Sequence, residues 1–404
     1  MKIKDIGHVV TGKTPSTEID EYYGGNIMFI SPSDLHGDYL IEESEKTITE
    51  EGLNSIETNS IGGLSVLTGC IGWDMGNVAM CNSRCATNQQ INTITRFNES
   101  IADPRYVYYW LKGKKDYLFS IASVTRTPIL SKSVFEDIDI PIPCLGLQKK
   151  VANLLSSIDE KIRINNKIND YLEEMAKTIY DYWFVQFDFP DKNGKPYKSS
   201  GGTFKNGLPI GWNYVPIKNI CNILSGFSFQ SDDYVQNGKY KLLTIKNVQD
   251  TGINLDVDNY INILPENMPD FCKLDIGSIL MSLTGNVGRV GILYDSNCLL
   301  NQRVSLMQAK NPIMTPFIYC LLKSSKMRYI LESLATGTSQ KNLSPIEAGN
   351  IMIPYDSEIV KNFSKKVTPL IDSIITNLKE NNNLTNLREW LLPMLMNGQA
   401  TIEN

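Results

Sequence analysis

Two segments of the chain repeat apolar residues with the spacing of a single helical stripe. In the first segment, intervals of four and three residues alternate, which is typical of a coiled-coil seam on one side of an α-helix. At 1.5 Å per residue, each stripe predicts a helix of about 25 to 35 residues, or roughly 40 to 55 Å. The first stripe comprises Val151, Leu155, Ile158, Ile162, Asn165, Asn169, Leu172, Ala176, Ile179 and Trp183, and the second comprises Ile371, Ile374, Ile375, Leu378, Leu384, Leu387 and Leu391.

Local signals predict where these helices begin and end. Ser157 followed by Glu160 has the form of a capping box, so we expect the first long helix to begin there after a shorter lead-in turn. Thr368, with proline at the next position, is a favourable N-cap for the second helix. Pro393 and Gly398 predict the end of that helix.

The segments that precede the long helices, 1–145 and 206–355, have a different pattern. Short apolar runs such as 27–30 and 278–283 lie between Gly, Asn, Asp and Pro residues, which predicts strands joined by turns. Short helical stretches interrupt them, as at 104–111. Each segment therefore predicts an α+β globule of about 145 residues.

The chain repeats itself at a separation of 213 residues. The first match pairs residues 30–35 with residues 243–248, which end in Asp34-Leu35 and Asn247-Val248. The later matches, in order, are Asn88-Gln89 with Asn301-Gln302, Leu130-Ser131 with Leu343-Ser344, Ile140-Pro141 with Ile353-Pro354, and Ile158-Asp159 with Ile371-Asp372. Thr68-Gly69-x-x-Gly72 matches Thr284-Gly285-x-x-Gly288 at 216, which we interpret as a small loop insertion. The chain is thus a tandem duplication of a globule and a long helix.

Two related helices in one chain are predicted to pair with each other as an antiparallel coiled coil. Such a pair would relate the halves by a pseudo-two-fold axis and act as a spacer between the globules. The predicted segments are 1–145, the first globule; 146–205, the first long helix and an exposed connector rich in Pro, Gly, Ser and Lys at 187–202; 206–355, the second globule; and 356–404, the second long helix. The predicted helix-pairing residues are Leu155, Ile158, Ile162, Leu172, Ile179, Ile371, Ile375 and Leu378.

Composition narrows the class of protein. The 404 residues are 42% hydrophobic and 21% charged with a net charge of −5, which excludes a strongly basic fold that coats nucleic acid. Residues 1–145 carry 12 basic and 19 acidic side chains, a net of −7, whereas 206–355 carry 12 and 11, a net of +1. No signal-peptide or membrane-spanning run is visible, and we expect a cytoplasmic protein without a membrane role.

The residues needed for common catalytic centres are scarce. With two histidines and eight scattered cysteines, the sequence favours reduced, buried thiols and no metal site. It lacks the Asn/Asp-Pro-Pro-Tyr/Phe loop of an adenine methyltransferase and a phosphate-binding Gly-x-x-x-x-Gly-Lys-Ser/Thr loop. These absences argue against an adenine methyltransferase and against an enzyme with a phosphate-binding loop.

Several motifs together resemble the specificity subunits of Type I restriction-modification systems. They are Gly207-Leu208-Pro209-Ile210-Gly211-Trp212, Thr11-Gly12-Lys13-Thr14-Pro15-Ser16, the paired Thr-Gly-x-x-Gly strings, the Ile-Pro-x-Pro run at 140–143 before Leu147-Gln148-Lys149-Lys150, and the Phe-Pro-x-x-Asn-Gly-Lys-Pro-Tyr-Lys-Ser-Ser-Gly-Gly connector at 189–202. The likeness covers essentially the whole chain. The first copy departs from it, since it lacks the Leu-Pro-x-Gly-Trp opening and its domain edge is expected to differ.

The resemblance implies a function without catalysis in this chain. Two target-recognition domains would each read one half of a split, asymmetric site in double-stranded DNA. The two helices would seat two modification (methyltransferase) subunits, and restriction subunits, which are ATP-dependent translocases and endonucleases, can join the complex. The partner subunits, not this chain, would bind S-adenosylmethionine, and ATP with Mg where a restriction subunit is present.

Base readout in double-stranded DNA uses Arg or Lys at guanine, Asn or Gln at adenine and small hydroxyls, all carried on loops. The candidates in the first copy are Lys13, Thr14, Ser16, Arg84, Gln89, Gln90, Arg126 and Thr127, and those in the second are Ser228, Gln230, Lys246, Arg289, Gln302, Arg303, Gln340 and Lys341. Repeated positions such as Gln89-Gln90 and Gln302-Arg303 can equally hold a turn.

Two other functions remain open from the sequence. A two-headed scaffold that binds proteins or glycans fits the acidic first globule, and DNA binding would differ from it by falling steeply with salt. An autonomous methyltransferase would transfer methyl groups from S-adenosylmethionine without a partner.

Overall fold

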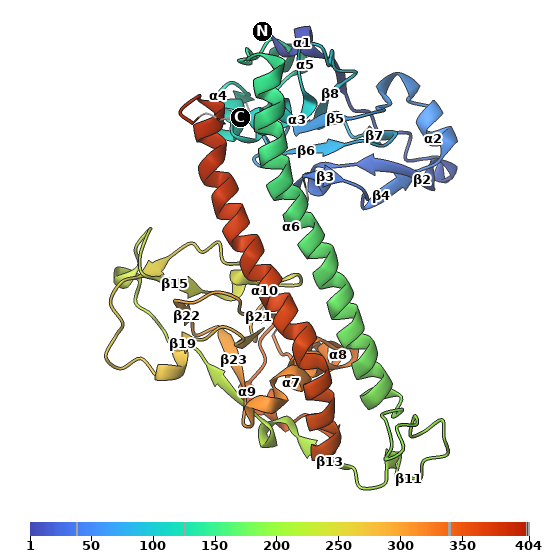
Figure 1. The fold of residues 1–404 in the computed structure, drawn as a ribbon, viewed down its shortest axis with the longest axis vertical. Coiled ribbons are helices and arrows are strands. Elements are labelled where there is room, and N and C mark those ends of the chain that lie inside the picture. The colour runs from blue at the N-terminus through green and yellow to red at the C-terminus, as the bar shows by residue number, and fades with distance from the viewer. Residues whose placement is uncertain (38, 125, 338–340, 401, 403–404) are drawn as a thin grey trace. The chain divides into compact units, whose positions relative to one another are not determined.

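Two continuous helices run through the computed structural model, which describes residues 1–37, 39–124, 126–337, 341–400 and 402 (Figure 1). Helix α6 (Leu145–Tyr180) has 36 residues and α10 (Ser357–Met396) has 40. The chain forms two compact units: Met1–Ile164 with Asn381–Asn404, and Asn165–Glu380. Each unit therefore contains one globule and a part of both long helices, rather than one complete copy of the repeat.

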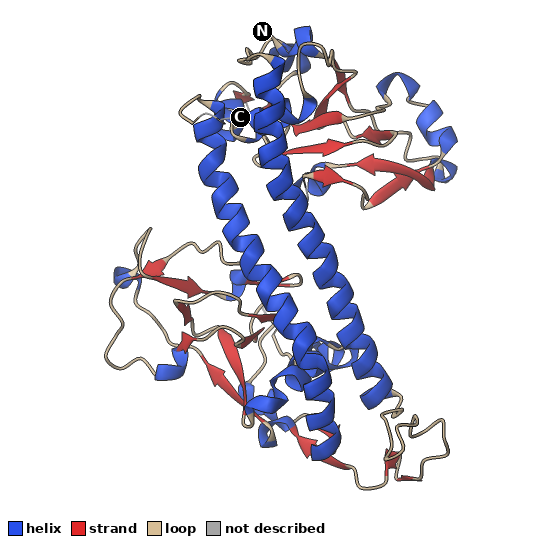
Figure 2. Cartoon of the chain, viewed as in Figure 1, coloured by secondary structure: helices blue, strands red, loops and turns tan. Residues whose placement is uncertain are grey.

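The first globule is an α+β fold, as predicted. Its main sheet has five strands in the order β1-β8-β5-β6-β3, and a second sheet has the order β4-β2-β7 (Figure 2). The elements are α1 (Ile3–Ile6), β1 (His8–Thr11), η1 (Asp20–Tyr22), β2 (Tyr23–Ile30), η2 (Pro32–His36), β3 (Leu40–Ile41), β4 (Lys46–Ile48), α2 (Glu50–Asn54), η3 (Glu57–Asn59), β5 (Ser65–Gly69), β6 (Val78–Cys81), β7 (Cys85–Thr87), β8 (Ile91–Thr95), α3 (Pro104–Lys112), α4 (Lys115–Ser120), β9 (Ser123–Val124), β10 (Pro128–Ile129) and α5 (Lys132–Glu136).

The second globule repeats this topology. Strands β14-β23-β20-β21 take the order of β1-β8-β5-β6, and the parallel pair β15 and β22 matches the parallel pair β2 and β7. The elements are β11 (Phe204–Lys205), β12 (Leu208–Pro209), β13 (Asn213–Pro216), η5 (Ile217–Asn219), β14 (Cys221–Ser225), η6 (Ser231–Asp233), β15 (Tyr240–Leu243), η7 (Ile245–Asn247), β16 (Val248–Gln249), β17 (Gly252–Ile253), β18 (Tyr260–Ile261), η8 (Asp270–Cys272), β19 (Lys273–Leu274), β20 (Ile279–Ser282), β21 (Val290–Ile292), β22 (Cys298–Leu300), β23 (Val304–Ala309), η9 (Pro312–Met314), α7 (Thr315–Lys323), α8 (Ser325–Leu334), α9 (Pro345–Asn350) and β24 (Met352–Tyr355). The tandem duplication is confirmed in three dimensions.

The long helices pair in opposite directions. In the second unit, Asn165 donates a 2.7 Å hydrogen bond to Glu380, and Asn377 donates one of 2.9 Å to Asn169. The residue number rises along α6 while it falls along α10, so the pair is antiparallel. Both α6 asparagines are buried, as the stripe predicted. Of the predicted pairing residues, Leu155, Ile158 and Ile371 are buried, and Ile162, Leu172, Ile179, Ile375 and Leu378 are half-buried.

Both predicted helix starts were wrong. Helix α6 begins at Leu145, and the Ser157 hydroxyl only donates back to the Leu154 carbonyl inside the helix. The earlier turns form because Val151 and Leu155 are buried in the core of the first unit. Local capping signals lose to such burial, since most helical stability in proteins comes from packing.

Helix α10 likewise begins eleven positions before Thr368, at Ser357. Asp356 caps it, since its side chain accepts hydrogen bonds of 2.9 Å from the N–H groups of Glu358 and Ile359. Val360, Phe363 and Val367 then extend the apolar stripe into the core of the second unit. The helix continues past Pro393 and stops at Met396, close to Gly398, which adopts φ +69°.

The connector at 187–202 is more ordered than the sequence suggested. Phe189 is buried and stacks on Tyr197 and Trp212, with ring centroids 4.8 and 5.3 Å apart. A π-helical turn (Asp181–Val185) leads into it from α6. Its aromatic residues thus belong to the core of the second unit, while its lysines remain exposed.

The domain edges differ between copies, as expected from the missing opening motif. In the second copy β13 pairs with β24 over four residues. In the first copy the equivalent edge is a single bridge between Lys2 and Asp139. Among the described residues, no helix is long and apolar enough to cross a bilayer.

Candidate nucleic-acid interface

Several loops leave the main sheet of the first globule at one end. Strands β1 and β5 both finish there, and β8 starts there. The Cys70 N–H donates to the Gln90 carbonyl at 2.7 Å, and the Gly72 N–H donates to the Pro128 carbonyl at 3.0 Å. These two bonds join three loops, and the Gly12 N–H, which donates to the Ile91 carbonyl at 3.0 Å, brings a fourth loop to the same surface. The loops are 12–16, 70–77, 88–90 and 126–130, called here the first loop cluster.

The second globule builds an equivalent surface with two matching hydrogen bonds. The Gly285 N–H donates to the Lys341 carbonyl at 2.8 Å, 213 positions after the bond of Gly72 with Pro128. The Leu343 N–H donates to the Leu283 carbonyl at 2.8 Å, which matches the bond from Leu130 to Cys70. The second loop cluster therefore comprises 226–230, 283–289, 301–303 and 341–343.

A glycine fixes the closest approach of two loops in each cluster. A Cβ on Gly12 would lie 2.0 Å from the Asn88 carbonyl oxygen, and one on Gly226 would lie 2.3 Å from the Asn301 carbonyl oxygen. Real Cβ atoms do not approach backbone this closely, so only glycine fits at either position. The Asn-Gln matches seen in the sequence mark the partner loop of this contact.

The register proposed for the Thr-Gly-x-x-Gly strings was wrong. The Gly69 N–H donates to Asn77, and its structural counterpart is the bond from Ser282 to Arg289. Gly69 thus corresponds to Ser282 and Gly72 to Gly285, both at 213. The length difference instead lies at the hairpin tip, which is one residue longer in the first copy.

Most first-copy candidates lie in the first loop cluster. The Thr14 hydroxyl donates a 2.8 Å hydrogen bond to the Gln89 side chain, which ties two loops together. Gln90 is half-buried and its N–H bonds to the Asn88 side chain at 3.0 Å, so it holds a turn. Lys13, Ser16, Arg126 and Thr127 are exposed.

Arg84 does not lie in the first loop cluster with the other first-copy candidates. It lies in the turn after β6, at the end of the sheet where β5 begins rather than finishes. Its guanidinium pairs with Glu50 at 2.8 Å. The sequence offered no means of telling the two ends of the sheet apart at this turn.

In the second cluster, Ser228, Gln230, Gln302, Arg303 and Lys341 are exposed. Gln340 lies outside the described residues. Lys246 follows β15 toward the same end of the sheet, and its exposed ammonium pairs with Asp258 at 2.7 Å, which raises the pKa of Lys246. The predicted match of 30–35 with 243–248 is confirmed here. Asp34 caps Ser31 as Asn247 caps Thr244.

Arg289 is engaged in an ion-pair network rather than free at the surface. It and Arg328 each contact Asp250 at 2.7 Å. Burial alone would raise the pKa of Asp250, but the hydrogen bonds and charges of Arg328 and Arg289 outweigh it and lower that pKa. In the first copy Lys115, 213 positions before Arg328, pairs with Asp74 at 3.2 Å. Lys115 thus ties the tip of the first hairpin directly to α4, whereas Asp250 bridges Arg289 of the second hairpin and Arg328 of α8. The equivalent positions of Lys115 and Arg328 were overlooked in the sequence.

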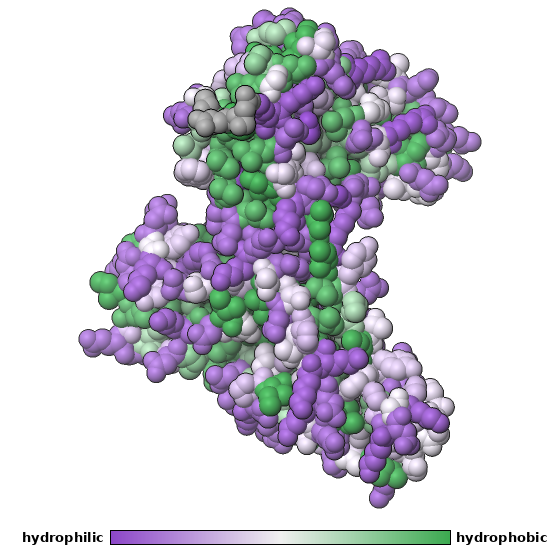
Figure 3. Space-filling view, viewed as in Figure 1, coloured by the Kyte–Doolittle hydropathy of each residue, from purple (hydrophilic) through white to green (hydrophobic). Residues whose placement is uncertain are grey.

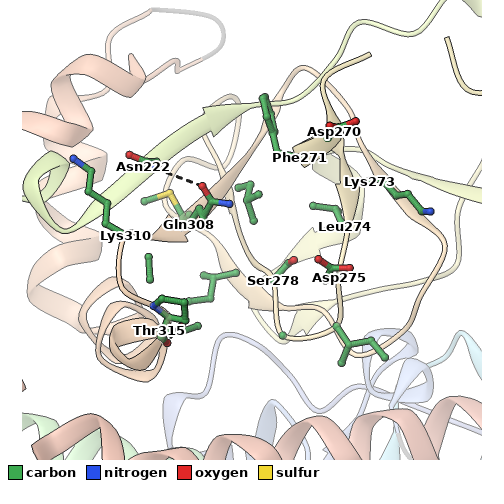
Figure 4. A pocket seen from close by; sticks show the side chains of 17 residues that line it. Asn222, Asp270, Phe271, Lys273, Leu274, Asp275, Ser278, Gln308, Lys310 and Thr315 are labelled. Carbon is green, nitrogen blue, oxygen red and sulfur yellow. Dashed lines mark hydrogen bonds between the residues drawn. The ribbon is translucent and has the colours of Figure 1, made fainter. Parts of the chain in front are cut away.

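One hollow lies away from the loop clusters. It has a volume of about 1010 Å³ and opens on the second globule, near the end of β14 opposite the loop cluster (Figure 4). Asn222 donates to Gln308 across its wall at 3.4 Å, with Lys310 and Asp275 nearby. Within the described part of the chain, no three His, Cys, Asp or Glu side chains are placed to share a metal ion.

Comparison with known proteins agrees with this architecture. The family model described as "Type I restriction modification DNA specificity domain" matches residues 1–174 and 209–386. The Type I restriction enzyme MjaIX specificity subunit of Methanocaldococcus jannaschii is 29% identical, over 100% of this chain and 93% of that protein. The HindI specificity subunit of Haemophilus influenzae is 21% identical, over 75% of this chain and 78% of that protein.

A solved structure shares the fold. The S subunit of a Type I restriction-modification system from M. genitalium has a TM-score of 0.58 and 17% identity, and the alignment covers 98% of this chain and 95% of that one. The family model accounts for most of both globules and both long helices. The chain therefore belongs to the family of Type I restriction-modification specificity subunits.

Proposed function

We propose that this chain recognises a bipartite, asymmetric site in double-stranded DNA, one half with each loop cluster. The observation that carries this proposal is that the clusters share one hydrogen-bonded frame but present different side chains. Gln90 of the first cluster, which holds a turn, stands where the second cluster has the exposed Arg303. Since arginine favours guanine, the frame that presents Arg303 would read a different half-site from the equivalent frame that lacks it.

The chain directs chemistry that its partners perform. Two modification subunits, which bind S-adenosylmethionine, methylate adenine at the site, and restriction subunits with ATP and Mg add cleavage. The proposed docking surface for a modification subunit is an exposed apolar row on α6 (Figure 3). In the second unit this row contains Ile168, Tyr171 and Met175, and Tyr171 is 67% exposed. Exposed apolar rows on a helix mark interaction surfaces.

Docking is tested by adding charge to this row. Tyr171→Lys with Met175→Lys should abolish co-purification of the modification subunits, because it would bury two cations in the interface. The control is Lys177→Glu, which reverses an exposed charge on the same helix. Equal loss of co-purification in the double variant and the control, or retained co-purification in the double variant, would contradict the assignment of this row as the docking surface.

Recognition is tested by mapping N6-methyladenine across the genome with and without the gene. We expect loss of one split motif. Exchange of residues 206–355 for those of a relative should then change one half-site and leave the other intact. Unchanged methylation after deletion would refute the function, and changes in both half-sites would refute the separate readout. A salt titration separates this function from a protein scaffold, since DNA affinity falls steeply with ionic strength.

A further inference from the structure

The tips of the two equivalent hairpins carry different chemistry. In each cluster, two glycines in the left-handed region frame the tip: Gly72 and Gly76 at φ +103° and +88°, and Gly285 and Gly288 at φ +75° and +82°. Such φ values strain any other residue, so the backbone of both tips is defined by the same device. Between the glycines, the first copy has Trp-Asp-Met and the second has Asn-Val.

Most of these tip residues are already engaged in the globule. Met75 and Val287 are only 1% and 3% exposed, respectively, and each anchors its tip in the core. Asp74 pairs with Lys115 at 3.2 Å. The remaining residues are Trp73 in the first tip and Asn286 in the second, which makes them equivalent in position.

Both remaining side chains face solvent. Trp73 is 70% exposed, although burial of a tryptophan side chain is strongly favourable. Its ring centroid lies 6.0 Å from that of the Phe119 ring, and the two ring planes are tilted by 38°. Asn286 is exposed, and its carbonyl accepts a hydrogen bond from the Ser282 hydroxyl, which fixes the backbone beneath the side chain.

The tips stand beside the loops that hold the other candidate readers. Gly72, next to Trp73, bonds to Pro128 of the loop that carries Arg126 and Thr127. Gly285, next to Asn286, bonds to Lys341. The two tip side chains are thus placed at the same point of two matching surfaces, one for each half-site.

We propose that Trp73 and Asn286 are specificity-determining residues, each contacting bases of its own half-site in duplex DNA. Indole offers a broad apolar surface that packs on thymine methyl groups or wedges at a base step, whereas the amide of asparagine forms paired hydrogen bonds with adenine. The first half-site is therefore read at this point by apolar contact and the second by adenine recognition. This inference rests on the proposed function.

The test maps methylated sites in cells that express the chain with its modification subunits. Asn286→Ala should relax one A·T requirement in the second half-site about tenfold and leave the first half-site intact. Trp73→Ala should relax or weaken the first half-site by a similar factor without altering the second, and Trp73→Phe should restore much of it. Trp73→Asn should introduce an adenine preference at that point.

Two matched controls test whether the loss of any exposed aromatic residue or asparagine would change the motif. Tyr117→Ala removes an exposed aromatic residue of α4, and Asn219→Ala removes an exposed asparagine of η5, both outside the loop clusters. Both should keep the wild-type motif. Circular dichroism and partner co-purification check folding.

The outcomes separate the two proposals. A wild-type complex that methylates no bipartite site refutes the proposed function itself. A bipartite wild-type motif that survives unchanged in Trp73→Ala and Asn286→Ala refutes only the role of the tips. A change in the wrong half-site also refutes it.

Discussion

Arg388 of α10 forms an ion pair with Asp159 of α6 in the interior of the first unit, although 229 positions separate the two residues. The Asp159 side chain is 2% exposed and also accepts a 2.6 Å hydrogen bond from Tyr109 of α3. Burial and the adjacent carboxylate raise the pKa of that tyrosine. The pair therefore joins the globule to both long helices.

Removal of Arg388 should strongly destabilise the first unit. Arg388→Met leaves a buried carboxylate without its cation, at a cost of about 3–5 kcal/mol. The double variant with Asp159→Leu should recover most of this loss, since apolar replacement of a buried pair is often neutral. Urea unfolding measures both. Lys132→Met, which breaks an exposed pair with Glu136, is the control and should change little. Equal effects of Arg388→Met and the control would contradict the role of burial.

Alanine at Gly12 or Gly226 should disrupt the corresponding loop cluster. The added Cβ would press against a backbone oxygen that cannot rotate away, so the free energy of unfolding should fall by about 3 kcal/mol. Methylation should lose the matching half-site requirement. Gly62→Ala is the control, because a Cβ added at Gly62 would have no neighbouring atom within 4 Å. A normal motif in Gly12→Ala would show that the close contact is dispensable.

The contribution of Lys112 to the stability of the first unit should rise with pH in the alkaline range. Burial, followed by the positive charge of Arg388, lowers the pKa of Lys112 to about 8 from its usual 10.5, although Asp159 and Glu389 act in the opposite direction. Between these values the folded chain loses a proton that the unfolded chain retains. The free energy of unfolding then increases by up to about 1.4 kcal/mol per pH unit.

This pH dependence is measured by urea unfolding from pH 7.5 to 10 on wild type and on Lys112→Met. The difference between the two proteins should grow in favour of wild type as pH rises. A constant difference would show that Lys112 keeps its ordinary affinity for protons.

Lengthening both helices should lengthen the gap between the two half-sites. Asn166 and Lys379 are neighbours of the bonded pair Asn165 and Glu380, so insertions there fall opposite each other in the antiparallel pair. Four residues add about 6 Å, close to two base pairs, and about 40° of rotation. We expect both half-sites to persist with a longer spacer between them. A folded, partner-bound variant that methylates only the original spacing would leave the helices as a docking platform alone.

The long helices and the repeat could be predicted from periodic patterns in the sequence, whereas the tertiary contacts could not. The four-three spacing from Val151 onward predicted a helix with buried Asn165 and Asn169, because a stripe fixes a face. The matches at a separation of 213 predicted two globules of the same fold. Matched residues form equivalent hydrogen bonds, as the N–H groups of Asn88 and Asn301 do.

The predictions from the sequence failed where contacts between residues far apart in the chain determine the structure. Thr368 has the side chain of a favourable N-cap, but the burial of Phe363 in the core of the second unit makes α10 begin earlier, at Ser357. Arg289 has the chemistry of a guanine reader, but Asp250 engages it. Trp73 and Asn286 were overlooked, because the proposed register at 216 did not align the two tips.

The core of the first unit also contains residues that the ribosome makes after the whole second unit. Leu392 and Leu395 of α10 pack with Val151 and Leu155 of α6 and with the first globule. During synthesis, the core of the first unit therefore stays incomplete until Leu392 and Leu395 have been made, whereas residues 165–380 already contain the second unit. A premature stop after residue 380 would leave the later-made unit complete and expose apolar surface on the earlier-made one, which makes the first unit the target for chaperones and proteases.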